Sequence, residues 1–219
     1  MEFDAIIQYI PLFIKAFWLT VKIGVLGIGL SFILGIITAF VMYFKIPFFN
    51  QIAKVYVELF RNTPLLVQLF FIYFGLPKIG LSISAEVCGI MGLALLGGSY
   101  MAESIRSGLE AIPKSQNESA FALGLNKRQL FFKVILPQAF SISVPALVAN
   151  VIFLLKETSV FSAISLMDLM FTAKDLIGLY YKTTECLLLL VIFYMIMLVP
   201  VSLMGSLIEK KARFAMFGD

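Results

Sequence analysis

Residues 23–44 read IGVLGIGLSFILGIITAFVMYF, a run of 22 residues without a charged side chain. A helix needs about 20 apolar residues to cross the hydrocarbon core of a bilayer, so this run predicts a transmembrane helix. Two more charge-free runs, Val134–Leu155 and Cys186–Ile208, have 22 and 23 residues. The sequence therefore predicts an all-α integral membrane protein, with residues 1–219 forming a single transmembrane domain.

The composition of the whole chain agrees with this class. Its 219 residues are 61% hydrophobic and 14% charged, whereas a soluble domain has about 25% charged residues. Histidine is absent, and Cys88 and Cys186 lie in separate apolar runs, so we expect no metal site, redox pair or disulfide framework. We interpret the net charge of +4 as a matter of membrane orientation and expect no nucleic-acid partner.

Two shorter runs complete a predicted set of about five transmembrane helices. Asn62–Pro77 and Val87–Ala102 each hold 16 uncharged residues, and they reach full length only if charged residues at one end are included. We expect these charged residues at the inner ends of the two spans, in structural roles. They are Glu58, Arg61, Glu103 and Arg106, which have i, i+3 spacing within each pair.

The distribution of Lys and Arg predicts the orientation. Five spans place the two termini on opposite sides, and an outer N-terminus puts eleven Lys and Arg inside and three outside. Inner loops carry the excess of basic residues in membrane proteins, so we predict an outer N-terminus and a cytoplasmic C-terminus. Met1–Ile10 lacks the basic start of a secretory signal, so we expect no cleavage there.

The longest inner connection, residues 106–137, reads as two short helices. Ser115 and Glu118 have the spacing of a capping box at a helix start. Gly124 suits the left-handed conformation that ends a helix, and Asn126 begins a second capping pattern. The small and apolar residues between these signals predict a helix that packs on the membrane face or enters the groove of a partner.

Several motifs carry a resemblance to a known family. Residues 118–124 read ESAFALG, and residues 135–139 read ILPQA. In order along the chain lie FRNTPLLVQ at 60–68, YFGLP at 73–77, GGSYMAESIR at 97–106 and KETS at 156–159. Together they resemble the EAA-loop permeases of ABC importers, in the polar amino acid uptake branch with its histidine-, arginine- and glutamine-type members. Small departures occur at Ser99, Ser104, Ser115 and Ser119, where the family more often has Ala, Ile, Gly and Ala.

The resemblance implies a fold like that of a type I ABC-importer permease, with a coupling role for the inner loop. In that family the loop helix sits in a cleft of the nucleotide-binding subunit, so that ATP-driven closure moves the spans. Two roles stay open for Glu118, capping of its own helix and direct contact with the partner. The implied coupling residues are Glu118, Ser119, Ala120, Phe121, Ala122, Leu123 and Gly124.

A charged pair, Lys156-Glu157, follows the apolar run that ends at Leu155. The pair either lies at the outer interface and pairs locally, or lines a wet path. The resemblance favours the path, and it implies that Glu157 accepts an ammonium group of the substrate while Thr158 and Ser159 offer hydroxyls. The apolar stretch Thr158–Met167 is too short to cross, so we expect it at the surface or re-entering partway.

The chain lacks a Gly-x-x-x-x-Gly-Lys-Ser/Thr signature, so we expect no cofactor on it, and ATP with Mg on a partner chain. The resemblance implies an ABC ATPase dimer, a second permease subunit, an extracytoplasmic solute-binding protein, an amino acid substrate and lipid of the bacterial cytoplasmic membrane. An ion-gradient-driven carrier or channel would explain Lys156 and Glu157 but not the structured loop. An intramembrane enzyme would need a nucleophile–base or metal constellation, which the sequence lacks, so we predict a transport subunit.

Overall fold

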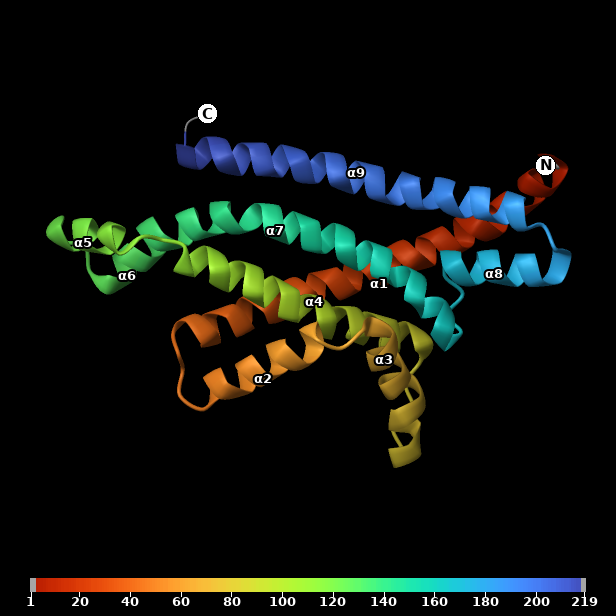
Figure 1. The fold of residues 1–219 in the computed structure, drawn as a ribbon, viewed down its shortest axis with the longest axis horizontal. Coiled ribbons are helices and arrows are strands. Elements are labelled where there is room, and N and C mark those ends of the chain that lie inside the picture. The colour runs from red at the N-terminus through yellow and green to blue at the C-terminus, as the bar shows by residue number, and fades with distance from the viewer. Residues whose placement is uncertain (1–2, 218–219) are drawn as a thin grey trace.

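The computed structural model describes residues 3–217, and within that range all regular structure is helical (Figure 1). Four long helices, α1, α4, α7 and α9, form the body of the molecule, and short helices lie between them. The bounds are α1 Phe3–Tyr43, α2 Phe49–Arg61, α3 Leu65–Phe70, η1 Phe71–Gly75, η2 Leu76–Ile79, α4 Ala85–Glu110, α5 Lys114–Ala122, α6 Lys127–Leu130, η3 Phe131–Ile135, α7 Leu136–Glu157, η4 Thr158–Ile164, α8 Leu169–Tyr180 and α9 Thr183–Phe217.

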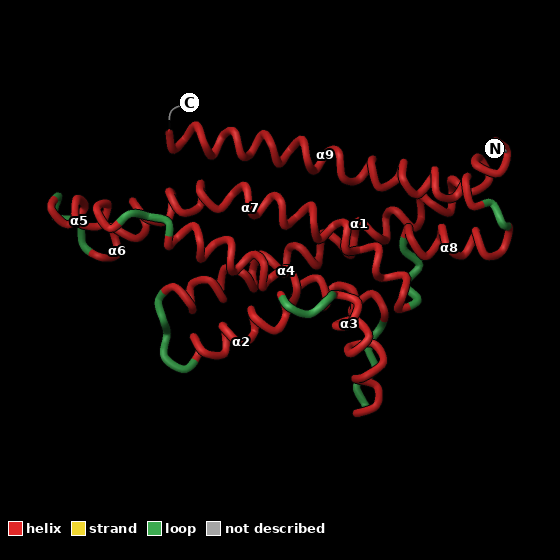
Figure 2. Tube along the Cα trace, viewed as in Figure 1, coloured by secondary structure: helices red, strands yellow, loops and turns green. Residues whose placement is uncertain are grey.

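The all-α membrane architecture predicted from the sequence is confirmed. Four segments are long and apolar enough to cross a bilayer, and a bent pair of helices can make a fifth span. α1 packs on α4, α4 on α7, and α7 on α9, and short loops join successive elements of the chain (Figure 2). Helices α5 and α6 and the C-terminal end of α9 lie at one end of the bundle, and α8 and the N-terminus lie at the other (Figure 1).

The second predicted span is bent instead of straight. α2 and the leg formed by α3, η1 and η2 meet at an angle of 106°. Pro64 is the N-cap of α3 with an extended backbone, and proline disfavours a helical conformation in the residue before it. The predicted run Asn62–Pro77 largely coincides with the second leg, Leu65–Ile79. Its extension back through Glu58 and Arg61 crosses the bend at Pro64, so the full-length span is not one straight helix.

Polar side chains at this bend donate to carbonyl groups in the last turn of α2. The Nδ2 of Asn62 donates to the carbonyl of Glu58 at 2.7 Å, and the Oγ1 of Thr63 donates to the carbonyl of Leu59 at 2.6 Å. Unpaired carbonyls are costly away from water. The Arg-Asn-Thr-Pro motif is therefore a device that ends one helix and turns the chain.

Gln68, on α3, hydrogen-bonds to the end of α2 and to the bend. Its Nε2 donates to the carbonyl of Phe60 at 3.0 Å and to that of Thr63 at 2.9 Å, and the side chain is buried. We expect Gln68→Leu to lower the free energy of unfolding by about 1–3 kcal/mol, because two partly buried carbonyls lose their donor. Chemical or thermal unfolding in detergent measures this. An unchanged midpoint would show that water replaces the amide.

Small residues bring α1 and α4 into close contact. A Cβ added at Gly27 would lie 2.7 Å from the Cβ of Leu93, and one added at Gly35 would lie 2.5 Å from the Cβ of Met101. Between these glycines the Oγ of Ser31 donates to the carbonyl of Leu93 at 2.9 Å. At Gly27 and Gly35 the absence of a side chain therefore lets α1 and α4 approach closely.

Most of the stretch Thr158–Met167 is in the interior and not at the surface. Residues Thr158–Ile164 form the 3-10 helix η4, in which Phe161 and Ile164 are fully buried in the main core, whereas Met167 at the end of the stretch is 66% exposed. The chain then turns into α8, whose first amide, of Leu169, donates to the Oγ1 of Thr20 on α1 at 3.2 Å. Helix α8 is not predicted by the sequence pattern, because its 12 residues are too few to cross a bilayer and carry no strong start signal besides Asp168.

Asp168, between the spans, is fully buried and caps α8. Its Oδ1 accepts from the amide of Phe171 at 2.8 Å, and its Oδ2 has no hydrogen-bond partner among the described residues. Burial raises the pKa of this carboxyl from 3.8 to about 7, although backbone amides and Lys174 act in the opposite direction. A raised carboxyl pKa means that the folded state binds a proton that the unfolded state has released.

This carboxyl therefore predicts a pH-dependent stability. The folded protein should lose stability as pH rises from about 4 to about 7, by about 1.4 kcal/mol per unit of pKa difference, and then level off. Asp168→Asn keeps a capping oxygen and has no charge to release, so we expect a flatter profile. Thermal unfolding midpoints of both proteins between pH 4.5 and 8 measure it, and parallel profiles would contradict it.

Candidate functional site

A line of charged side chains joins α2 to the last turns of α4. Arg106 donates from its Nε and Nη2 to the carboxylate of Glu103 at 3.1 and 2.6 Å, and from its Nη1 to Glu110 at 2.6 Å. The predicted i, i+3 pair between Glu103 and Arg106 is therefore confirmed. Both side chains are 26% exposed, so the pair lies at an accessible face and contributes little to folding by itself.

Arg61, the last residue of α2, extends toward these charged side chains on α4. An Nη atom of Arg61 lies 3.9 Å from Glu103, and its guanidinium lies 5.4 Å from the centre of the Tyr100 ring. Among the described residues no ion pair joins Arg61 to Glu58, the other partner considered from the sequence. The structure places Arg61 at the end of α2, where it ties the bend to α4. Sequence patterns within one helix could not show a contact between two helices.

The predicted coupling segment forms α5 and the turn after it, at the tip of the molecule (Figure 1). The capping box expected from Ser115 and Glu118 does not form. Pro113 takes the N-cap position and no side chain caps the helix, because a proline there starts the helix before Ser115 is reached. Glu118 is exposed and does not cap its helix in this structure, and its contact with a partner stays a prediction.

The other signals in the loop are confirmed. Gly124 has a φ of +77° and ends the α5 turn, as expected for the left-handed stop. Asn126 and Gln129 form a reciprocal capping box. The backbone amide of Gln129 donates to the Oδ1 of Asn126 at 2.9 Å, and the backbone amide of Asn126 donates to the Oε1 of Gln129 at 3.0 Å. From Lys127 the chain runs through η3 into α7 without a gap in its helical structure. The loop helix α6 is thus continuous with a membrane span.

The α5 segment has a buried and an exposed side. Ala120 is buried with Leu109, Leu130 and Ile135. Two apolar side chains face away from the molecule, since Phe121 is 49% and Leu123 is 81% exposed. Apolar groups exposed together at a projecting tip, outside the apolar span region, indicate a protein–protein contact site.

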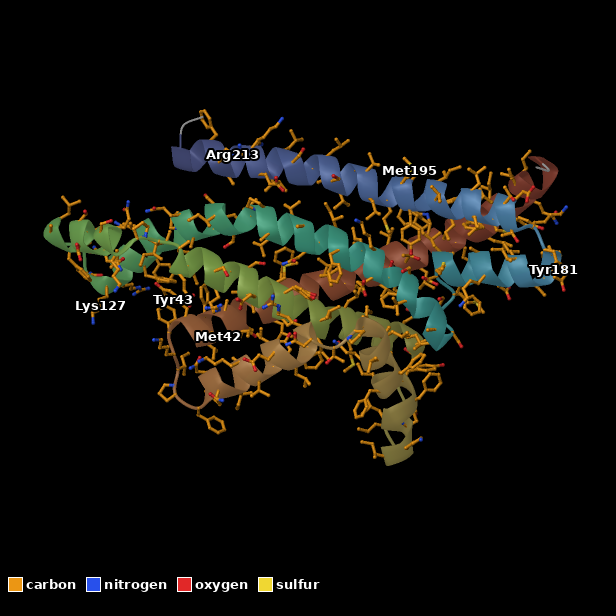
Figure 3. The ribbon with its side chains drawn as sticks, in the orientation of Figure 1. Met42, Tyr43, Lys127, Tyr181, Met195 and Arg213 are labelled. Atoms are coloured by element: carbon orange, nitrogen blue, oxygen red, sulfur yellow. The ribbon has the colours of Figure 1, made fainter. Side chains whose placement is uncertain are left out.

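Phe131 connects this loop to the end of α1. Its ring centre lies 5.1 Å from that of Phe44, 6.0 Å from that of Phe40 and 6.1 Å from that of Tyr43. Figure 3 shows Tyr43 and Lys127 toward the same end of the molecule. A displacement of α5 and α6 would therefore reach α1 through packed rings as well as α7 through the continuous backbone.

The predicted path residues lie where α7 passes into η4. Lys156 is exposed, and Glu157 and Ser159 are partly exposed. Among the described residues neither Lys156 nor Glu157 has an ion-pair partner, so the local pairing considered from the sequence is not seen. Thr158 differs, because its side chain is fully buried and its Oγ1 donates to the carbonyl of Leu155 at 2.7 Å.

Comparison with known proteins agrees with the geometry. The family described as "Binding-protein-dependent transport system inner membrane component" matches residues 31–214. The arginine transport system permease protein ArtQ of Bacillus subtilis (strain 168) is 33% identical over 214 residues, covering 97% of this chain and 98% of its own. The probable amino-acid ABC transporter permease protein PatM of Vibrio harveyi is 33% identical over 196 residues, covering 88% of each chain.

A solved structure shares the whole architecture. A chain of a crystal structure described as an amino acid ABC transporter with histidines superposes with a TM-score of 0.89 at 34% identity, covering 96% of this chain and 99% of that chain. The bent second span, the loop helix and the long spans are therefore those of a type I ABC-importer permease. The chain belongs to the family of binding-protein-dependent transport system inner membrane components, and it is the permease subunit of an ABC importer.

Proposed function

We propose that this chain forms one half of the membrane path of an importer for polar amino acids in the bacterial cytoplasmic membrane. A second permease subunit, the same chain or a related one, supplies the other half. A separate ATPase dimer holds ATP and Mg, and an extracytoplasmic solute-binding protein delivers the substrate. The exposed apolar tip of α5 is the observation that carries this proposal, because a membrane subunit without an ATP site needs such a contact.

Alternating access is the proposed mechanism. ATP binds one arrangement of the ATPase dimer better than the other, and this differential affinity shifts the population of the whole assembly. α5 moves with the dimer, and α7 and α1 follow through the continuous α6–η3 backbone and the Phe131 rings. In the proposed orientation the end that carries α5 faces the cytoplasm.

We propose polar amino acids, basic or neutral, as the substrate class. Glu157 carries a carboxylate at the end of a membrane span without an ion-pair partner among the described residues. A charged carboxylate within the membrane is unfavourable in free energy unless a cation pairs with it or water solvates it. The ammonium group of an amino acid supplies that charge, with Lys156 and Ser159 nearby to meet its other polar groups. The relatives named for arginine and for amino acids agree with this class.

Glu157→Gln tests the substrate role. We expect the substrate concentration for half-maximal uptake to rise about tenfold or more, because the loss of one charge contact of about 1.4 kcal/mol has that effect. The matched control is Glu86→Gln, since the carboxylate of Glu86 makes an exposed contact with Lys22 at 2.8 Å outside the proposed path. Uptake by reconstituted transporter measures both. Equal effects of the two substitutions would contradict the assignment.

Phe131→Ala tests the mechanical connection. We expect ATP hydrolysis to continue while uptake per ATP falls several-fold, because α5 still binds the ATPase but α1 no longer follows it. Phe132→Ala is the control, because Phe132 is 57% exposed and its ring contact is with Phe131 alone. Hydrolysis and uptake are measured in the same vesicles. An unchanged ratio for Phe131→Ala would show that α7 alone transmits the motion.

A further inference from the structure

Two hollows on the surface of the helix bundle join into one groove. The first, of about 360 Å³, lies between α1, α7 and α9, and the second, of about 520 Å³, lies along the same three helices toward α8. Both are lined by Phe32, Val151 and Val201, so they meet there. We call this feature the α1–α7–α9 groove, and its further lining includes Trp18, Met204 and Ile208.

The groove is apolar along its length and is open on one side. α9 lies against α7 so closely that a Cβ at Gly205 would clash with the Cγ1 of Val148. Trp18 is 65% and Met204 is 63% exposed. In a membrane subunit an apolar groove of this kind can hold hydrocarbon, because apolar walls leave no polar group unpaired there.

The length of the groove suits one acyl chain. Its lining on α9 runs from Ile196 to Ile208, which is about 18 Å at the helical rise. One leaflet of the hydrocarbon core is about 15 Å thick, half of the whole. An acyl chain that enters at Ile208 and spans about 15 Å would therefore fill most of the groove and end near Ile196.

Three basic residues come just after Ile208 in the chain, at the entrance of the groove. Lys210, Lys211 and Arg213 are exposed, and with Phe214 they border a hollow at the end of α9. Lys211 is three residues after Ile208, so it lies on the same helix face as the groove entrance. Between residues 209 and 214 the only acid is Glu209. Arg213 is labelled in Figure 3, at the end of α9 away from Tyr181.

We propose that the α1–α7–α9 groove binds the acyl chain of an anionic phospholipid, whose headgroup phosphate is held by Lys210, Lys211 and Arg213. The excess of cations at the entrance matches an anionic and not a zwitterionic headgroup. Anionic lipids are concentrated in the cytoplasmic leaflet, and the site rests on the proposed orientation, which places the end of α9 there. The substrate path and the α5 contact do not overlap with this site.

Native mass spectrometry tests the site on the full chain, purified in mild detergent with any subunits that stay bound. The probes are phosphatidylglycerol and phosphatidylcholine of equal acyl length. We expect retained phosphatidylglycerol in the wild type, and about a tenfold loss of retention in the triple variant K210Q/K211Q/R213Q. The matched control, K45Q/K54Q/K127Q, removes three exposed cations away from the groove and should retain the lipid.

A second variant tests the groove separately from the charges. Val201→Phe adds a ring to the wall shared by both hollows, so we expect it to reduce retention of both lipids. Equal loss in the two triple variants, or equal retention of the two lipids by the wild type, would overturn the proposal. So would an intermolecular disulfide through Met204→Cys, because a second chain would then cover the groove. Uptake driven by ATP is measured in parallel, so that failure of the lipid site and failure of the proposed function are separate outcomes.

Discussion

Leu123→Asp is expected to abolish ATP-driven uptake while the permease stays folded in the membrane. Leu123 is 81% exposed at the tip of α5 and supports no core cluster, so its replacement should leave the stability of the chain unchanged within about 0.5 kcal/mol. If the tip enters an apolar cleft of an ATPase, a buried unpaired carboxylate there costs several kcal/mol. Association between the permease and the ATPase should then fall by more than about a hundredfold.

Co-purification of the ATPase and uptake by reconstituted vesicles measure this effect. The control is Leu81→Asp, which places the same charge at a 58% exposed leucine in the loop before α4. We expect that protein to keep both the ATPase and the uptake. Normal association of the Leu123→Asp permease would show that α5 is not the contact. The shorter variant Leu123→Ala should have an intermediate effect, because it removes apolar area without adding a charge.

Gly97→Leu is expected to prevent stable folding. Gly97 lies on α4 against α1 and α7, and a Cβ added there would clash with the Oγ of Ser31 and come within 2.6 Å of the Cδ1 of Leu154. Both neighbours are fully buried, so neither can move aside. Overpacking of a tight core costs about 1–3 kcal/mol or more, and each kcal/mol lowers the midpoint of a chain of this size by about 2–4 °C.

The matched control is Gly29→Leu on α1, where an added Cβ would meet nothing within 4 Å. We expect the Gly97 variant to unfold at least about 6 °C below the wild type, or to fail to accumulate, while the Gly29 variant stays within about 2 °C of it. Fluorescence-detected gel filtration after heating measures both. Equal midpoints would mean that α1 and α4 do not approach as closely as the structure shows.

The sequence predicted the spans well because the bilayer imposes a strong rule on length and charge. All but the last residue of the charge-free run at 23–44 lies within α1, which extends back to Phe3 past Lys15 and Lys22. Those two cations broke the run but not the helix, since long basic side chains can reach the interface while their stems stay in the apolar region. A count of uncharged residues therefore places the start of this helix too late, because it ends the span at any charged residue.

Contacts between elements were beyond sequence patterns. The i, i+3 spacing of Glu103 and Arg106 showed a local pair, but the position of Arg61 over Tyr100 follows from the 106° bend, which brings α2 alongside α4. Thr158 was grouped with Glu157 by motif, yet the turn from α7 into η4 points its side chain into the core. Residues that are adjacent in a sequence motif can have side chains that point into different parts of the structure, as Glu157 and Thr158 do.

The central claim is that this chain moves substrate only when a separate ATPase acts on α5. Uptake into vesicles tests it most directly, with purified permease reconstituted either alone or together with its ATPase and solute-binding protein. We predict uptake of a polar amino acid only in the complete assembly with ATP, and none by the permease alone under a proton or sodium gradient. Uphill uptake by the permease alone would contradict the account and favour an ion-driven carrier.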